Sequence, residues 1–141
     1  MAWISDTNGW GPVERNTSNG RKASGDGTPI SLDKTVYSKG LGVHADSEIV
    51  YWLARRFTRF TAVVGIDDFS ANQSNQGSVV AEVWVDGRKA FDSGVLTAAT
   101  KSRKVDVDLT GVSVLRLVVR DSGNGYSYDH TSWANAFVRH I

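Results

Sequence analysis

The chain has 141 residues, a length that fits one domain with a core large enough to fold unaided. Its 16 Lys and Arg against 15 Asp and Glu give a net charge of +1, without the basic surplus that a nucleic-acid partner would require. No apolar run approaches the roughly 18 residues of a membrane span, so we expect no membrane partner. The absence of Cys excludes disulfides, thiolate zinc sites and cysteine nucleophiles.

The composition and the hydrophobic periodicity both indicate an all-β fold. Five Trp, four Tyr and 14 Gly accompany only two Pro, and apolar residues recur with the period of two that is typical of strands. In chain order, alternation predicts strands at Glu48–Leu53, Phe60–Ile66, Ser78–Asp86, Lys104–Leu109 and Val114–Arg120. No segment keeps a helical apolar stripe over about twelve residues, so we expect almost no helix.

Turn signals separate these strands at the spacing expected for a sandwich or barrel. Asp86-Gly87 predicts a two-residue hairpin turn with positive φ at both positions. Three connections are long, and long loops in a compact β domain are often functional: Asn8–Pro29, Asp67–Gly77 and Asp121–Trp133.

The segment Gly40–Ala45 places His44 after two glycines. The following residues are strand-like, so this segment lacks the helix that a phosphate-binding glycine loop requires. His44 is then either a hydrogen-bonded residue of a turn or a ligand contact. Asp67 and Asp68 end a strand and point to opposite faces, so they cannot act together as acid and base; one could serve in a turn or bind calcium.

Two segments carry side chains suited to a sugar. Residues Tyr126–Trp133 combine aromatic rings with Asp129 and His130, and the apolar face of a pyranose stacks on such rings while its hydroxyls require fixed donors and acceptors. Trp133 could instead fill the core, with Asp129 capping the loop. Trp10 lies between Gly9 and Gly11, which indicates either a close backbone approach or a simple turn. No activating context supports a serine nucleophile.

Seven blocks in order resemble one known family. They are Gly-Trp-Gly-Pro-Val-Glu-Arg-Asn from Gly9, Tyr-Ser-Lys-Gly-Leu-Gly-Val-His-Ala from Tyr37, Val-Gly-Ile-Asp-Asp from Val64, Val-Asp-Gly from Val85, Asp-Ser-Gly-Val-Leu from Asp92, Val-Asp-Val-Asp-Leu-Thr-Gly from Val105, and Tyr-Asp-His-x-x-Trp-Ala from Tyr128. This series is similar to the NPCBM domain, also called carbohydrate-binding module family 51.

The resemblance implies a jelly-roll type β-sandwich of antiparallel strands, without catalytic activity, that binds galactose and galactose-terminated glycans, including blood-group A and B structures. It implies that residues 1–141 are one module excised from a larger, secreted or cell-surface glycoside hydrolase, and we expect a monomer. By position, it implies sugar contacts from Trp10, Glu14, Asn16, His44, Asp129, His130 and Trp133.

A bound calcium ion is typical of similar sandwiches, which makes Asp26, Asp121 and Asn135 the candidate metal ligands by resemblance. The family's closing block usually has two further acids where this chain has Ser132 and Asn135, and losing carboxylates weakens a calcium site. A second interpretation of the chain is a protein-interaction or structural sandwich that uses the outward row of Glu82 and Trp84. A third, a small glycosidase, lacks two carboxylates facing across a cleft.

Overall fold

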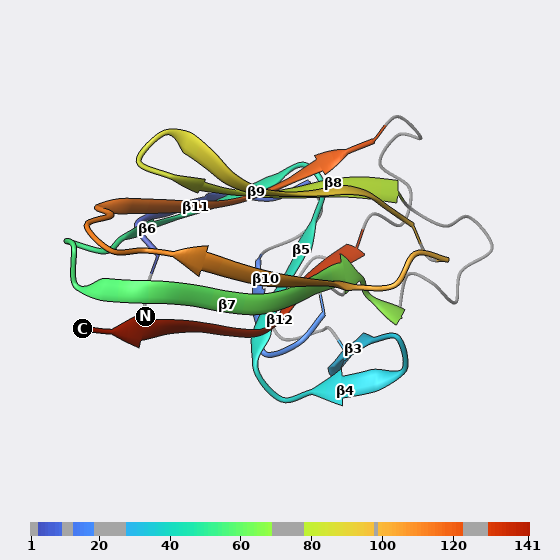
Figure 1. Cartoon of the computed structure of the whole chain (residues 1–141). Helices are drawn as coiled ribbons and strands as arrows, with labels where there is room; N and C mark the ends of the chain where they lie inside the picture. The colour runs from blue at the N-terminus through green and yellow to red at the C-terminus, as the bar shows by residue number, and fades with distance from the viewer. Residues whose placement is uncertain (1–2, 10–12, 19–27, 69–77, 98, 123–129) are drawn as a thin grey trace.

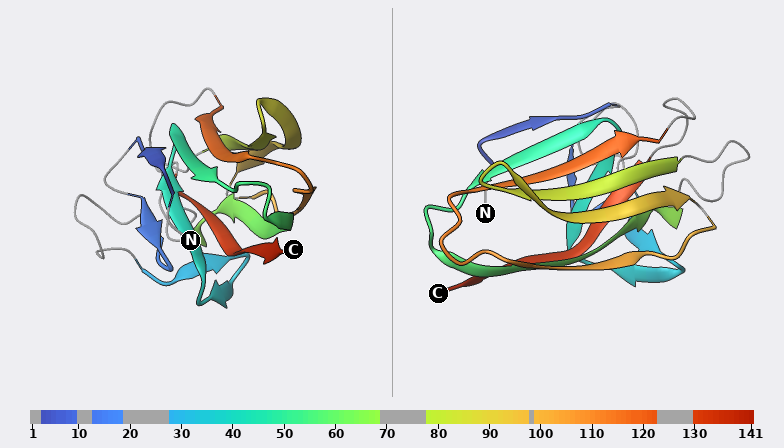
Figure 2. Two further views of the ribbon diagram at one scale, coloured as in Figure 1. Left: turned by 90° about the vertical axis from the view of Figure 1, so that its left-hand side faces the viewer. Right: turned by 45° about the horizontal axis from the view of Figure 1, so that its top comes forward.

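The computed structural model describes residues 3–9, 13–18, 28–68, 78–97, 99–122 and 130–141. Two antiparallel sheets face each other as a sandwich (Figure 1), and further views show them as separate layers (Figure 2). Sheet A has the order β1 (Ser5–Thr7), β6 (Ser47–Trp52), β11 (Val114–Asp121), β8 (Ser78–Val85) and β9 (Arg88–Thr97). Sheet B has the order β10 (Arg103–Asp108), β7 (Phe57–Ile66), β12 (His130–His140), β5 (Gly40–His44) and β2 (Glu14–Arg15). The all-β, jelly-roll prediction is confirmed.

The core lies between the sheets and is built from the alternating rows read in the sequence. In β8 the residues Val79, Ala81, Val83 and Val85 are buried, and every other predicted strand is present with its apolar row facing inward. Burial of these rows in two facing layers removes apolar surface from water, which is the main favourable term in folding.

The predicted turn after β8 is also confirmed. Asp86 has φ 48° and Gly87 has φ 80°, the positive values that a two-residue hairpin of this type needs at both central positions. The carboxylate of Asp86 accepts hydrogen bonds from the backbone N–H groups of Ser113 and Val114, so this turn is tied to the start of β11.

Two sequence expectations are wrong. Gly40–His44 is not a turn but the strand β5, whose five residues are all buried because β5 pairs with β12 on one side and β2 on the other. His130 and Trp133 lie inside the strand β12 and not in the preceding loop. The glycines of β5 and the polar residues at the start of β12 give no strand pattern in the sequence. Both strands are stabilised by pairing with neighbours on both sides and not by local propensity.

A hairpin of β3 (Ile30–Leu32) and β4 (Thr35–Tyr37) covers part of the outer face of sheet B. Ile30 and Leu32 pack with Ala134 in a second apolar cluster. Within the described ranges, no helix is long and apolar enough to cross a membrane.

Candidate functional site

The outer face of sheet B, beside the end of β5, brings together three of the residues expected to contact sugar. His44 pairs directly with His130 across β5 and β12, and Glu14 of β2 pairs with Gly42 two residues before His44. Paired residues, and residues two apart on one strand, share a face, so Glu14, His44 and His130 lie on the same side of the sheet. Residues separated by more than one hundred positions thus form one cluster.

The two imidazoles contact each other edge to face, with ring centroids 4.9 Å apart and planes at 89°. His44 is 3% exposed, His130 5% and Glu14 3%. The Nδ1 atom of His44 lies 2.6 Å from the carbonyl oxygen of Ala45. Because a carbonyl only accepts, this Nδ1 carries the proton, and the Nε2 atom of the neutral ring is an acceptor.

The segment before β2 closes on the same strand end. The side chain of Asn8 accepts a hydrogen bond of 2.8 Å from the backbone N–H of His44, and the N–H of Gly9 donates to the carbonyl of His44 at 3.1 Å. A Cβ at Gly9 would lie 2.0 Å from the carbonyl oxygen of Ala45. Only glycine allows this approach, which supports the close-approach interpretation at Gly9, the residue before Trp10.

The site also contains two residues that the sequence did not assign to it. Asp67, 1% exposed, accepts a hydrogen bond of 2.7 Å from the hydroxyl of Ser132, and its N–H donates to the carbonyl of His130 at 3.0 Å. Asp67 also accepts from the N–H of Ser31 at 3.3 Å, whereas Asp68 accepts from the hydroxyl of Ser31 and the N–H of Lys34. The interpretation of this pair as a hydrogen-bonded strand end is confirmed, and Asp67 adds a second buried carboxylate beside the histidines. The expectation that the two carboxylates point to opposite faces is wrong, because both accept a hydrogen bond from Ser31 where the strand β7 has ended.

Two other predicted contacts lie elsewhere. Trp133 is 0% exposed and packs near Phe60 between the sheets, with ring centroids 6.4 Å apart. Its predicted sugar contact is therefore wrong, and the interpretation of Trp133 as a core residue is confirmed. The side chain of Asn16 accepts a hydrogen bond of 3.1 Å from the N–H of Gly40, at the opposite end of β5 from His44. Trp10, Asp129 and Asp26 lie outside the described residues.

The two described candidates for calcium ligation are far apart. The N–H of Asp121 donates to the carboxylate of Asp46, beyond the end of β5, whereas the N–H of Asn135 donates to the carbonyl of Lys39, before its start. The length of β5, about 3.3 Å per residue, separates them. No group of three His, Cys, Asp or Glu in the described part of the chain could hold a metal ion. These residues do not fit one shared calcium site.

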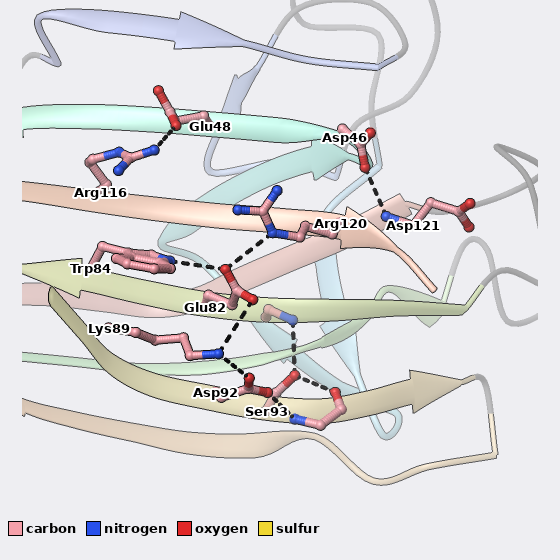
Figure 3. Close-up of polar contacts among 12 residues, drawn as sticks. Asp46, Glu48, Glu82, Trp84, Lys89, Asp92, Ser93, Arg116, Arg120 and Asp121 are labelled. Atoms are coloured by element: carbon pink, nitrogen blue, oxygen red, sulfur yellow. Dashed lines mark hydrogen bonds and ion pairs between the residues drawn. The ribbon is translucent and has the colours of Figure 1, made fainter. Parts of the chain in front are cut away.

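The outer face of sheet A, the alternative interface, carries a network of polar contacts (Figure 3). The buried carboxylate of Glu82 accepts from Trp84 Nε1 at 2.9 Å and from Arg120 Nε at 3.2 Å. Two hydrogen bonds hold the pKa of Asp92 below its usual value: the larger effect comes from Lys89 and the smaller one from the backbone N–H of Gly94. The row of Glu82 and Trp84 is thus satisfied by contacts within the sheet.

Comparisons with known proteins agree with the fold. The family model of the NPCBM/NEW2 domain matches residues 1–139. A protein of Renibacterium salmoninarum named "Putative endo-alpha-N-acetylgalactosaminidase" is 41% identical over 137 residues, which are 96% of this chain. This chain spans only 9% of that protein's length.

Two solved structures from Clostridium perfringens are similar over nearly the whole chain. The CBM51 module of GH95, in complex with methyl-galactose, is 35% identical with a TM-score of 0.88, covering 98% of this chain and 94% of that one. The structure of CBM51-2 in complex with GlcNAc, with INT domains, from ZmpB is 32% identical with a TM-score of 0.89, covering 99% and 30%.

Proposed function

We propose that this chain, which belongs to the NPCBM/NEW2 domain family, is a carbohydrate-binding module that recognises galactose-containing glycans at the cluster of Glu14, His44 and His130. It binds sugar without catalysing a reaction, and its partners are terminal galactose and blood-group A or B type glycans. In its parent protein it accompanies a secreted or cell-surface glycoside hydrolase, as the relatedness to an enzyme many times longer suggests.

The observation that carries the proposal is the convergence of these side chains on one sheet face. Buried carboxylates accept hydrogen bonds from sugar hydroxyls strongly, and imidazoles can both donate and accept. Strand backbones fix these groups in position, so little conformational entropy is lost on binding. A hydroxyl of the wrong stereochemistry would not lie within hydrogen-bond distance of these fixed groups, which is how such a site distinguishes sugars.

Binding of one sugar at a single site is expected to be weak, with a Kd on the order of 0.1 to 1 mM, or about −4 to −5.5 kcal/mol. Linkage to an enzyme on a surface that displays many glycans compensates by raising the effective concentration. The net charge of +1 agrees with an uncharged ligand.

The test is titration calorimetry with methyl-galactoside, GlcNAc and glucose, together with a glycan array. We expect binding of galactose-terminated glycans, and at least about tenfold weaker binding by His44→Ala, because the variant loses a fixed acceptor. His140→Ala is the matched control, since this third histidine lies at the far end of β12. A folded chain that binds no galactosylated glycan would overturn the ligand assignment, and equal loss in both histidine variants would overturn the site.

A further inference from the structure

At the end of the sandwich away from the histidine cluster, sheet A extends further than sheet B. The strand β12 pairs with β7 along both of its halves, but it pairs with β5 only over His130–Ala134. Its second half, from Phe137 to His140, therefore has β7 as its neighbour on one side only. Beyond the bulge at Asn135, the described strands give β12 no partner on its other side. Sheet A continues over this region through β11 and β6, so its inner face extends past the edge of sheet B.

A cavity of about 310 Å³ occupies the space beneath this overhang. Side chains from both sheets form its apolar part, namely Tyr51, Leu115, Leu117, Phe60 and Val138, whereas Arg15, Asn16 and Lys39 form its polar part. The volume is about twice that of an engineered cavity, of about 150 Å³, that binds benzene. The cavity is bordered by β12 itself, where the side chain of Phe137 is 52% exposed.

The rim of the cavity is cationic and aromatic. Arg15 and Lys39 line it, and the described lining contains no Asp or Glu. The guanidinium of Arg15 lies 4.3 Å from the ring centroid of Trp3, and Trp3 meets Tyr51 edge to face at 6.4 Å. An apolar interior with positive charge at its rim favours an occupant that combines apolar and acidic groups.

An open strand edge offers backbone N–H and C=O groups, so the natural occupant is another strand. We propose that the edge of β12 from Ala136 to His140 accepts an extended segment of the polypeptide that adjoins this module in its parent protein, with an apolar side chain in the cavity and an acidic one near Arg15 and Lys39. The choice of partner rests on the proposed function, because an accessory module has adjoining polypeptide. β1 begins and β12 ends on this side of the sandwich, within reach of such a segment (Figure 1).

The experiment supplies a defined probe strand. Val-Glu-Val-Glu-Val is fused after Ile141 through a short Gly-Ser linker that lets it fold back along β12, and Val-Lys-Val-Lys-Val and the linker alone serve as controls. We expect amide hydrogen exchange at Ala136–His140 to slow at least about tenfold with the acidic probe, and less with the basic one.

Two variants keep the proposal open to refutation. Leu117→Phe fills the cavity and should remove the protection, with the melting temperature reporting whether the variant is folded. Lys39→Glu is at the rim and should reverse the preference between the two probes. Equal protection by both probes, protection by neither, or concentration-dependent protection in the unfused chain, which would identify a second copy, would each overturn the proposal. Galactoside titration of the same fusions reports the histidine cluster separately, so failure of one proposal does not resemble failure of the other.

Discussion

The two halves of β12 differ in almost every respect although they are one strand. The first half, His130–Ala134, is paired on both sides and wholly buried, and it carries a polar cluster on one face and Trp133 on the other. The second half is paired with β7 and carries the exposed ring of Phe137 beside an apolar cavity. Pairing on both sides allows polar groups to be buried and fixed, whereas an open edge leaves apolar groups exposed for a partner.

The largest expected difference between the halves concerns stability. Trp133→Ala should lower the free energy of unfolding by about 3 to 5 kcal/mol, because it leaves a large cavity between the sheets. Phe137→Ala, in the half-open part of the same strand, should cost less than about 1 kcal/mol. Urea denaturation of both variants measures this, and similar losses would contradict the contrast.

The stability of the protein should depend on pH through Tyr51, which lines the cavity. Burial raises the pKa of Tyr51 from 10.0 to about 12, although Arg15 partly opposes the shift. Since the folded pKa is above the unfolded value, this contribution to stability is fully present below pH 10 and is lost as pH rises through about 12. The loss amounts to about 2 to 3 kcal/mol, on the order of two pKa units. Denaturation at pH 9 and pH 12 should show it in the natural chain but not in Tyr51→Phe.

The polar half is tested by Glu14→Gln. This change keeps the shape of the side chain but removes a charged acceptor, so affinity for methyl-galactoside should fall about tenfold, or about 1.4 kcal/mol. Glu48→Gln, which breaks an ion pair with Arg116 on the other sheet, is the matched control. Unchanged affinity in Glu14→Gln would exclude this carboxylate from the binding site.

The smallest of these expected effects is at Asn135, where the two halves of β12 meet. Asn135 has φ 52°, a left-handed conformation that asparagine tolerates and alanine does not. Asn135→Ala should cost about 1 kcal/mol, whereas Asn135→Gly should be nearly neutral. Thermal unfolding of the two variants checks this; equal stabilities would mean that the backbone at the junction adjusts freely.

The strands with regular alternation could be predicted from the sequence because each buries one face, as in β8 and β10. β5 could not, since Gly40 and Gly42 have no side chain to mark its outer face and its burial comes from β2, β12 and the covering hairpin. The same reason explains the misplaced start of β12, where His130 and Ser132 interrupt the apolar pattern with groups that only tertiary pairing satisfies.

The candidate site was predicted in part through family resemblance, and its arrangement could not be. Nothing local relates Glu14 to His130, because strand pairing through β5 alone brings them together. Trp133 was misassigned because aromatic residues suit both a sugar platform and a core, and only the inward face of β12 decides between them. Asp67 was missed because its partner, Ser132, lies 65 positions away.

The alternation along β12 has a consequence for how new specificities could arise. His130 and Ser132 point to the outer face of sheet B, whereas Thr131 and Trp133, their neighbours in the chain, point to the inner face, where Trp133 belongs to the core. Under the proposed function, substitution of His130 would alter a sugar contact while Trp133, on the opposite face of the strand, keeps its packing between the sheets. A library at positions 44 and 130 that keeps Ser132 would vary the proposed sugar contacts without removing the hydrogen bond that the Ser132 hydroxyl donates to the buried carboxylate of Asp67.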